Sequence, residues 1–186
     1  MVQLVNLNVG AGLDIRAGWL NCDRVALPGI DLVFDVESFP WPIAAGSVTR
    51  ALLRDVLEHT STPVLVLEEV ARVLVPGGTV EIQVPHFTSR VAHLDPTHVR
   101  SFSCESFDFL TVGHARSYYI KRPFERVTFR RISFGRSPLL PWNYILESLV
   151  NRSIRTMRAY ESTPLRAFPA LNVHIEMRSD SSSLNL

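Results

Sequence analysis

The strongest constraint on the fold is an apolar run, residues 4–9, that ends in the tight turn Gly10-Ala11-Gly12. Four of its six residues are apolar, and a short, mostly apolar run bounded by a turn predicts a buried strand. A Gly-x-Gly turn after such a strand lets the backbone approach a ligand and points backbone N–H groups at it. The third glycine of a dinucleotide fingerprint would fall at Ile15, so the pattern disfavours pyrophosphate binding.

Apolar runs and turns keep alternating through the first half, which predicts strands at residues 19–23, 30–36, 48–56 and 79–84. Thr62 as N-cap and Pro63 begin a helix that Pro76-Gly77-Gly78 ends. The few residues between Gly12 and Trp19 leave room for only a very short first helix. This pattern predicts an α/β, Rossmann-like fold, with a mostly parallel central sheet of about seven strands and helices on both faces.

The second half is less regular. We expect a helix at residues 105–112, a strand at 126–134, a long helix at 143–160 and a last strand at 172–177. No linker separates a second domain, so we expect a single domain over residues 1–178 and a flexible, serine-rich tail over residues 179–186.

Composition limits the class of protein. The chain has 186 residues, of which 46% are hydrophobic and 20% charged, as expected for a folded globular protein. No stretch approaches the roughly 18 apolar residues that span a membrane. The two cysteines, Cys22 and Cys104, have no metal-ligand spacing, so we expect free thiols and a cytoplasmic protein.

Charge is distributed unevenly along the chain. Residues 1–99 have six arginines and eleven acids, a balance of −5, whereas residues 100–186 have thirteen bases and seven acids, a balance of +6. Two interpretations stay open: an anionic partner of the second half, or arginines that are simply solvated. The second half contains a basic run made up of Arg116, Lys121, Arg122, Arg126, Arg130, Arg131 and Arg136.

Two aspartates follow the expected second and third strands. Asp23 could accept hydrogen bonds from both hydroxyls of a ribose, because a carboxylate has two acceptor oxygens. Asp35 could face the edge of an adenine. Each could instead be a turn or cap residue.

Together these segments resemble the class I S-adenosylmethionine-dependent methyltransferases, especially a compact bacterial subgroup. The resemblance covers roughly residues 4–110, and a weaker resemblance is found in the segment FPALNVHIEM near the end of the chain. The sequence departs from the family pattern at Ala11, which replaces the usual cysteine of the glycine turn. The segments that carry it are LNVGAG, WLNCD, DLVFDVESFPWPIAAGSVTRALLRDVLEH, VARVLVPGGTVEIQVPHF and HLDPTHVRSF.

The resemblance implies S-adenosylmethionine as cofactor, with S-adenosylhomocysteine as its product. Asn8, Gly10 and Gly12 would line the methionine part, and Asp23 would bind the ribose. The adenine would lie between Asp35 and Val36 on one side and the segment after the fourth strand, Arg54, Asp55 and Val56, on the other. At the positions of Glu58 and His59 the family residues are often structural.

Four side chains after the fifth strand could do the chemistry: His86, His93, Asp95 and His98. His86 or His98 could be a general base oriented by Asp95, which predicts these three as catalytic residues. A metal site is a weaker alternative, and we predict none; a turn at residues 95–97 within a hydrogen-bonded loop is the structural one. His93 and Arg100 are predicted to bind substrate, with Arg100 holding a carboxylate or phosphate.

We therefore predict a methyltransferase acting on a small polar or anionic acceptor, such as a sugar or specialised metabolite. An RNA or protein methyltransferase and a catalytically silent cofactor-fold binding protein are the alternatives. Nucleic acid is a possible partner that the sequence does not favour, no membrane is expected, and the protein would be a monomer or homodimer.

Overall fold

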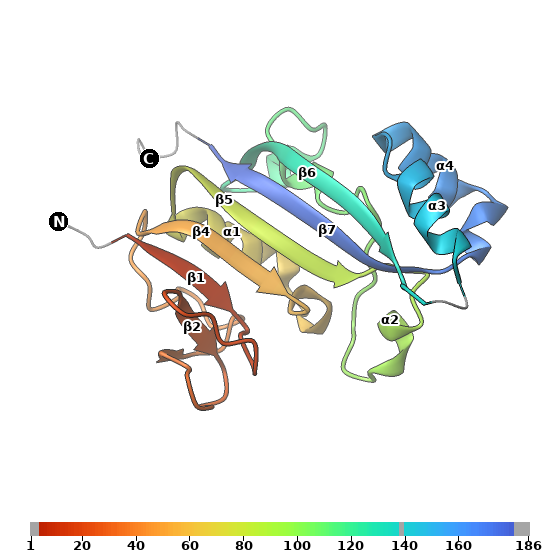
Figure 1. Ribbon diagram of the computed structural model, residues 1–186. Helices are drawn as coiled ribbons and strands as arrows, with labels where there is room; N and C mark the ends of the chain where they lie inside the picture. The colour runs from red at the N-terminus through yellow and green to blue at the C-terminus, as the bar shows by residue number, and fades with distance from the viewer. Residues whose placement is uncertain (1–3, 138–139, 181–186) are drawn as a thin grey trace.

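The computed structural model describes residues 4–137 and 140–180. Its centre is a seven-stranded sheet with the order β3-β2-β1-β4-β5-β7-β6 (Figure 1). Strands β1 to β5 pair in parallel, and β7 is antiparallel to both of its neighbours. This confirms the mostly parallel, Rossmann-like α/β fold. The strands are β1 (Val5–Val9), β2 (Leu20–Asp23), β3 (Leu32–Val33), β4 (Val48–Arg54), β5 (Leu74–Pro85), β6 (Phe124–Phe134) and β7 (Ala170–Ser179).

In the residues that the structure describes, four α-helices accompany the sheet: α1 (Pro63–Val73), α2 (Val91–Leu94), α3 (Trp142–Val150) and α4 (Ile154–Ser162). The helix predicted at residues 105–112 is wrong, since only the 3₁₀ turn Asp108–Leu110 forms there. The long helix predicted at 143–160 is divided in two. Ser153 caps α4 through a reciprocal pair of hydrogen bonds with Thr156, and this capping box starts a new helix where the old one ends.

The main core lies between α1 and one face of the sheet. Helix α1 buries Val66 and Val70 against strand residues such as Leu53 and Ile82. A smaller apolar cluster lies where α3 and α4 pack near the end of β6, and it includes the buried ring of Tyr160. Figure 1 shows these two helices at the end of the molecule farthest from β1.

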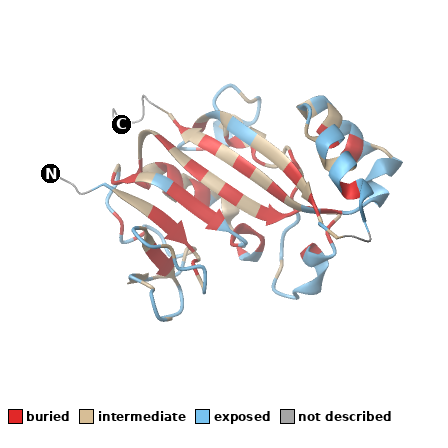
Figure 2. Cartoon of the chain, in the orientation of Figure 1, coloured by how far each residue is buried: buried red, intermediate tan, exposed pale blue. Residues whose placement is uncertain are grey.

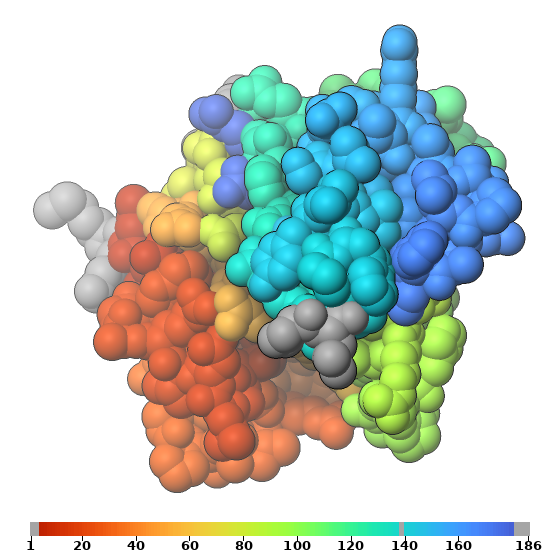
Figure 3. Space-filling model, turned by 45° about the vertical axis from the view of Figure 1, so that its right-hand side comes forward, coloured from red at the N-terminus to blue at the C-terminus, as the bar shows by residue number. Residues whose placement is uncertain are grey.

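The other face of the sheet has less cover. Within the described chain no helix occurs in residues 10–19 or 24–31, the connections on either side of β2. Burial therefore alternates along β5: Val80 and Ile82 are buried, whereas Glu81 and Gln83 are half-buried (Figure 2). Figure 3 shows the face hollowed between the N-terminal third of the chain and α3.

Buried amides hold the helix-free connection between β1 and β2. Asn8 donates to the Asn21 side-chain oxygen at 3.0 Å and to the Asp14 carbonyl at 2.7 Å. Asn21 also accepts from the Arg16 N–H at 2.9 Å and donates to the carbonyls of Arg16 and Trp19. Backbone groups that a helix would satisfy internally are here satisfied by two side chains.

A carboxylate from the loop after β3 holds the start of α1, and we call its hydrogen bonds the Glu37 clamp. One oxygen of Glu37 accepts from the backbone N–H groups of Ser61 and Thr62, both at 2.9 Å, and from their hydroxyls at 2.7 and 2.8 Å. Thr62 occupies the predicted N-cap position, but its side chain makes no capping bond. These bonds, led by the one from the Ser61 hydroxyl, lower the pKa of Glu37 despite its partial burial.

Strand β7 runs through Ser179, which is buried, so the predicted tail does not begin at that residue. Residues 181–186 of the tail lie outside the described residues. Cys22 and Cys104 are free and buried, and burial raises the pKa of each thiol to about 12. In the described part of the chain, no helix is long and apolar enough to cross a membrane.

We expect Asn21→Ala to lower the free energy of unfolding by about 3 kcal/mol or more, because each buried partner left unsatisfied costs about 1–3 kcal/mol. Asn172→Ala is the control, since Asn172 is half-buried in β7 and should cost less than about 1 kcal/mol. Urea denaturation measures both. Equal small losses would show that the amide network does not hold the connection.

Glu37→Ala should destabilise the protein by about 1–2 kcal/mol at neutral pH, because hydrogen bonds to a charged but partly exposed acceptor are lost. The folded pKa lies below the ordinary 4.5, so this contribution is complete above that value and disappears as the pH falls through the lowered pKa. Melting curves from pH 3 to pH 8 should therefore converge for wild type and variant in acid. A constant difference in Tm across this range would contradict the clamp.

Candidate functional site

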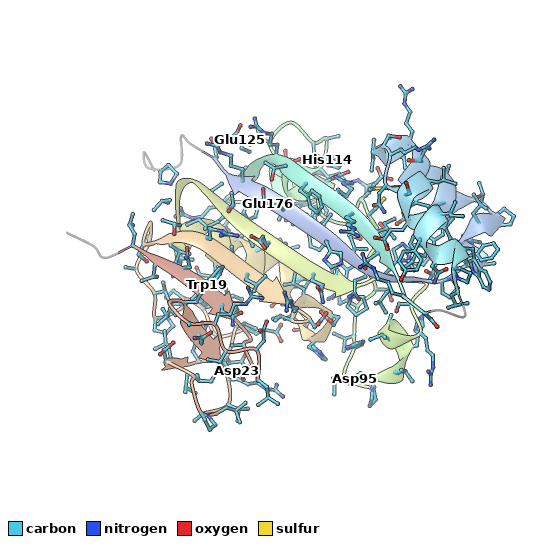
Figure 4. The ribbon with its side chains drawn as sticks, viewed as in Figure 1. Trp19, Asp23, Asp95, His114, Glu125 and Glu176 are labelled. Atoms are coloured by element: carbon cyan, nitrogen blue, oxygen red, sulfur yellow. The ribbon has the colours of Figure 1, made fainter. Side chains whose placement is uncertain are left out.

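A cavity of about 390 Å³ opens at the carboxyl ends of β1, β2 and β4. This is the edge where open α/β sheets bind ligands, and the volume is in the range of small-molecule sites. Figure 4 places Asp23 at the end of β2 and Asp95 beside α2, on the same side of the molecule. The cavity is lined by Gly10, Asp23, Arg24, Asp35, Val36, Glu37, Asp55, Val56, His59, Thr60 and Thr97.

Six of the nine predicted cofactor residues lie in this lining: Gly10, Asp23, Asp35, Val36, Asp55 and Val56. The other three are elsewhere. Asn8 is buried in the amide network, and Gly12 donates its N–H to Asp23. Arg54 pairs with Asp14 at 3.0 Å and borders a second cavity, on the open face of the sheet.

Gly10 turns the chain tightly beside Val56. Its φ is +63°, and an added Cβ would lie 2.5 Å from Cγ2 of Val56. Any side chain here would both strain the turn and displace Val56. The glycine is therefore needed to keep Val56 in its place in the wall of the cavity.

Asp23 joins the two turns that flank the cavity. One oxygen accepts from the Gly12 N–H at 2.8 Å and the other from the Val25 N–H at 3.0 Å. An ionised carboxylate has about four acceptor positions, so two stay available for hydroxyl groups. Asp23 therefore holds the two turns together, and its carboxylate keeps acceptor positions free for the predicted bonds to ribose hydroxyls.

Asp55 closes the opposite wall in a conformation unusual for a residue other than glycine, with φ at +55°. Gln83 donates to both of its oxygens, at 3.2 and 3.3 Å. Positive φ in such a residue costs free energy and is concentrated at functional sites.

The lining of the cavity is acidic. Asp55 is one of four carboxylates in it, with Asp23, Asp35 and Glu37, against one arginine, Arg24. This charge favours a cationic ligand.

His86 lies apart from this cavity. It is fully buried, and its ring nitrogens contact Glu161 of α4 at 2.9 Å and the Thr88 hydroxyl at 2.8 Å. These contacts tie the end of β5 to α4. The structure does not bring His86 together with Asp95 or with the cavity lining, so its catalytic role is a prediction that the geometry does not support.

Asp95 orients a different histidine from the one predicted. Its carboxylate accepts from the Thr97 N–H at 2.8 Å and the Thr97 hydroxyl at 2.7 Å, and the hydroxyl bond lowers its pKa. Because that hydroxyl donates to Asp95, it accepts from Nδ1 of His59, 2.9 Å away. The His98 backbone N–H donates to the Asp95 carbonyl at 3.2 Å, but within the described residues no hydrogen bond joins the Asp95 carboxylate to the His98 ring.

His98 packs edge-on against His59, with ring centroids 4.6 Å apart, and its Nδ1 lies 3.3 Å from the Ala92 carbonyl. A carboxylate oxygen of Glu58 lies within 4.8 Å of a nitrogen of each ring, and the residue is only 1% exposed. Neither oxygen of its carboxylate has a hydrogen-bond partner among the described residues. Burial raises the pKa of Glu58 to about 7.

The two predicted substrate-binding residues are outside the lining. His93 is exposed on α2, with Nε2 3.3 Å from the Phe87 carbonyl. Arg100 donates to the carbonyl of Ser61, beside the Glu37 clamp.

Five lining residues are outside the predicted cofactor set: Arg24, Glu37, His59, Thr60 and Thr97. Arg24 and Glu37 closely follow Asp23 and Asp35, and that proximity was a usable signal. Thr97 offered none, since only tertiary structure brings residues 95–98 to this cavity.

Residues 5–82 match the family model of the methyltransferase domain. Similar solved structures include a SAM-dependent methyltransferase from Archaeoglobus fulgidus, with 14% identity over 95% of this chain and 86% of that one and a TM-score of 0.62. The YcgJ protein from Bacillus subtilis has 16% identity over 96% and 92%, with a TM-score of 0.56. The [4+2]-cyclase SpnF has 15% identity over 97% and 76%, with a TM-score of 0.56.

No curated protein gives a significant match to the chain. The low identities to solved structures show the fold, and the family match covers the strands that build the cavity, from β1 into β5. On these two findings, residues 5–82 are similar to the methyltransferase domain, and the chain as a whole has the fold of S-adenosylmethionine-dependent methyltransferases.

Proposed function

We propose that this protein is a class I S-adenosylmethionine-dependent methyltransferase, which moves the methyl group of the cofactor to a small polar or anionic acceptor, such as a sugar or specialised metabolite. The observation that carries the cofactor assignment is the acidic cavity at the strand ends, lined by six residues that the family resemblance implies. The bound cofactor would supply an activated methyl group on a positively charged sulfur. Four carboxylates in the lining suit that charge.

Each wall of the cavity has a part in this proposal. Gly10 lets the backbone approach the methionine portion, and the free acceptor positions of Asp23 would take the ribose hydroxyls. Asp35 and Val36 would face the adenine, while Asp55 and Val56 close the other side. The protein's main contribution is to hold acceptor and methyl group in line, which can lower the barrier by up to about 7–11 kcal/mol.

The acceptor would enter beside His59 and Thr97, where the segment after β5 meets the cavity. That segment carries the exposed side chains of Arg90, His93 and Arg100, so it favours a polar or anionic molecule. We further propose that residues 1–178 act as one catalytic domain, as a monomer or homodimer in the cytoplasm.

The alternatives have less support. Several arginines of the basic run, which would suit RNA, are already paired: Arg126 with Glu125, Arg130 with Asp108 and Arg131 with Glu147. The fold alone does not establish methyl transfer, since one structural neighbour is a [4+2]-cyclase. A protein that binds the cofactor but transfers no methyl group to any tested acceptor would favour the silent binding protein.

We expect S-adenosylhomocysteine to bind with a micromolar Kd, equivalent to about −8 kcal/mol, because the cavity is already formed. Isothermal titration calorimetry with the purified chain measures this, and a thermal shift gives an independent readout. If neither heat nor a shift in Tm is observed, the proposed cofactor site is wrong. Screening candidate acceptors with labelled S-adenosylmethionine then tests the acceptor class.

Asp23→Ala should weaken this binding about tenfold or more, since loss of hydrogen bonds to a charged acceptor corresponds to at least about 1.4 kcal/mol. The same variant should lower the Tm, because the N–H groups of Gly12 and Val25 lose their acceptor. Measuring affinity and Tm on one preparation separates the two roles. Unchanged affinity in the folded fraction, with only the Tm reduced, would restrict Asp23 to the turn.

A further inference from the structure

Glu58, His59 and His98 form a compact cluster at the rim of the cavity. Each contributes one potential metal-ligand atom, and these atoms lie within 4.8 Å of one another. The segment after β4 supplies the first two residues, and the loop that follows α2 supplies the third. The sequence alone predicts no metal site, because His98 lies 39 positions from His59 along the chain.

The carboxylate of Glu58 is the first sign that the cluster is incomplete without a ligand. The residue is 1% exposed, and neither carboxylate oxygen has a hydrogen-bond partner among the described residues. Burying a carboxyl group without a hydrogen bond or a cation is costly, so such groups are normally satisfied. A proton or a metal ion would satisfy this one.

The two histidines are the second sign. His59 donates through Nδ1 to the Thr97 hydroxyl, and Nδ1 of His98 lies within reach of the Ala92 carbonyl. In the neutral ring the other nitrogen then carries a lone pair, and Nε2 of each ring has no hydrogen-bond partner in the described part of the chain. Metal-binding histidines typically have this arrangement, with one nitrogen free and the other hydrogen-bonded to a carbonyl or other acceptor.

We propose that Glu58, His59 and His98 bind a divalent transition-metal ion of the Zn²⁺ class. Two imidazoles and one carboxylate suit zinc and similar ions, whereas Mg²⁺ and Ca²⁺ prefer ligand sets made of oxygen alone. Three protein ligands leave at least one coordination position open, as in catalytic zinc sites. Asp95 supports the site through Thr97, which fixes the tautomer of His59.

The position of the cluster would place a bound ion where it can contact the acceptor. His59 and Thr97 line the cavity, so an ion on His59 stands at its edge. An open coordination position there is available to an oxygen atom of the acceptor. This last step rests on the proposed function, whereas the binding of the metal does not.

The test uses the untagged chain, treated with EDTA, dialysed and titrated with Zn²⁺ by calorimetry. We expect one ion per chain, and Co²⁺ in its place should give the visible absorption of a site with nitrogen ligands. Glu58→Gln and His98→Asn should each weaken Zn²⁺ binding at least tenfold. The control His93→Asn changes an exposed histidine of α2 outside the cluster and should bind like wild type.

Circular dichroism checks that each variant is folded, and S-adenosylhomocysteine is titrated in parallel. The metal site is wrong if wild type binds no stoichiometric Zn²⁺, or if Glu58→Gln and His98→Asn bind it as tightly as wild type. Normal S-adenosylhomocysteine binding in the same preparation would show that only the metal site has failed. Zn²⁺ binding without S-adenosylhomocysteine binding would instead leave the metal site standing and overturn the proposed cofactor.

Discussion

The hydrogen bond between the buried side chains of Asn8 and Asn21, 3.0 Å long, supports the part of the fold on which the site depends. It crosses from β1 to β2 and fixes a connection that has no helix in the described chain. Because that connection is short, the Gly10 turn and Asp23 lie close enough for the Gly12 N–H to bond to the aspartate. In a longer βαβ unit, a crossover helix would impose this spacing; here two amides do so.

The same short connection determines the character of the sheet. Without helices beside β2, the strands that follow cannot be apolar on both sides, and their second face carries polar residues. Arg50 pairs with Glu81 there, and Gln83 is next to His174 of β7 in the pairing register. Ion pairs at an exposed face contribute little to stability. The free energy of folding must therefore come mainly from the apolar side, where α1 packs.

The sequence predicted local features well and tertiary ones poorly. The Gly10 turn, Asp23 and strands such as β4 follow from spacing and polarity along the chain. The helix expected at residues 105–112 did not form, because tertiary packing buries Phe107 and Leu110 in the main core without a regular helix. The Glu37 clamp could not be predicted, since it joins residues 24 or 25 positions apart. The hydrogen bond between Thr97 and His59 joins residues 38 positions apart, so it could not be predicted from the sequence either.

The short segment between β4 and α1 connects the two sides of the site. It begins with the positive φ of Asp55 and ends with Ser61 and Thr62 held by Glu37, and Glu58 and His59 lie between them. The Val99 N–H donates to the Glu58 carbonyl at 2.8 Å, which fixes the loop carrying His98 to the same segment. Displacing this segment would therefore change the wall of the cavity and the histidine cluster together. Glu37, in the loop after β3, holds the segment on one side, and residues 97–100 hold it on the other. In the proposed function, this segment would help to keep acceptor and methyl group in line.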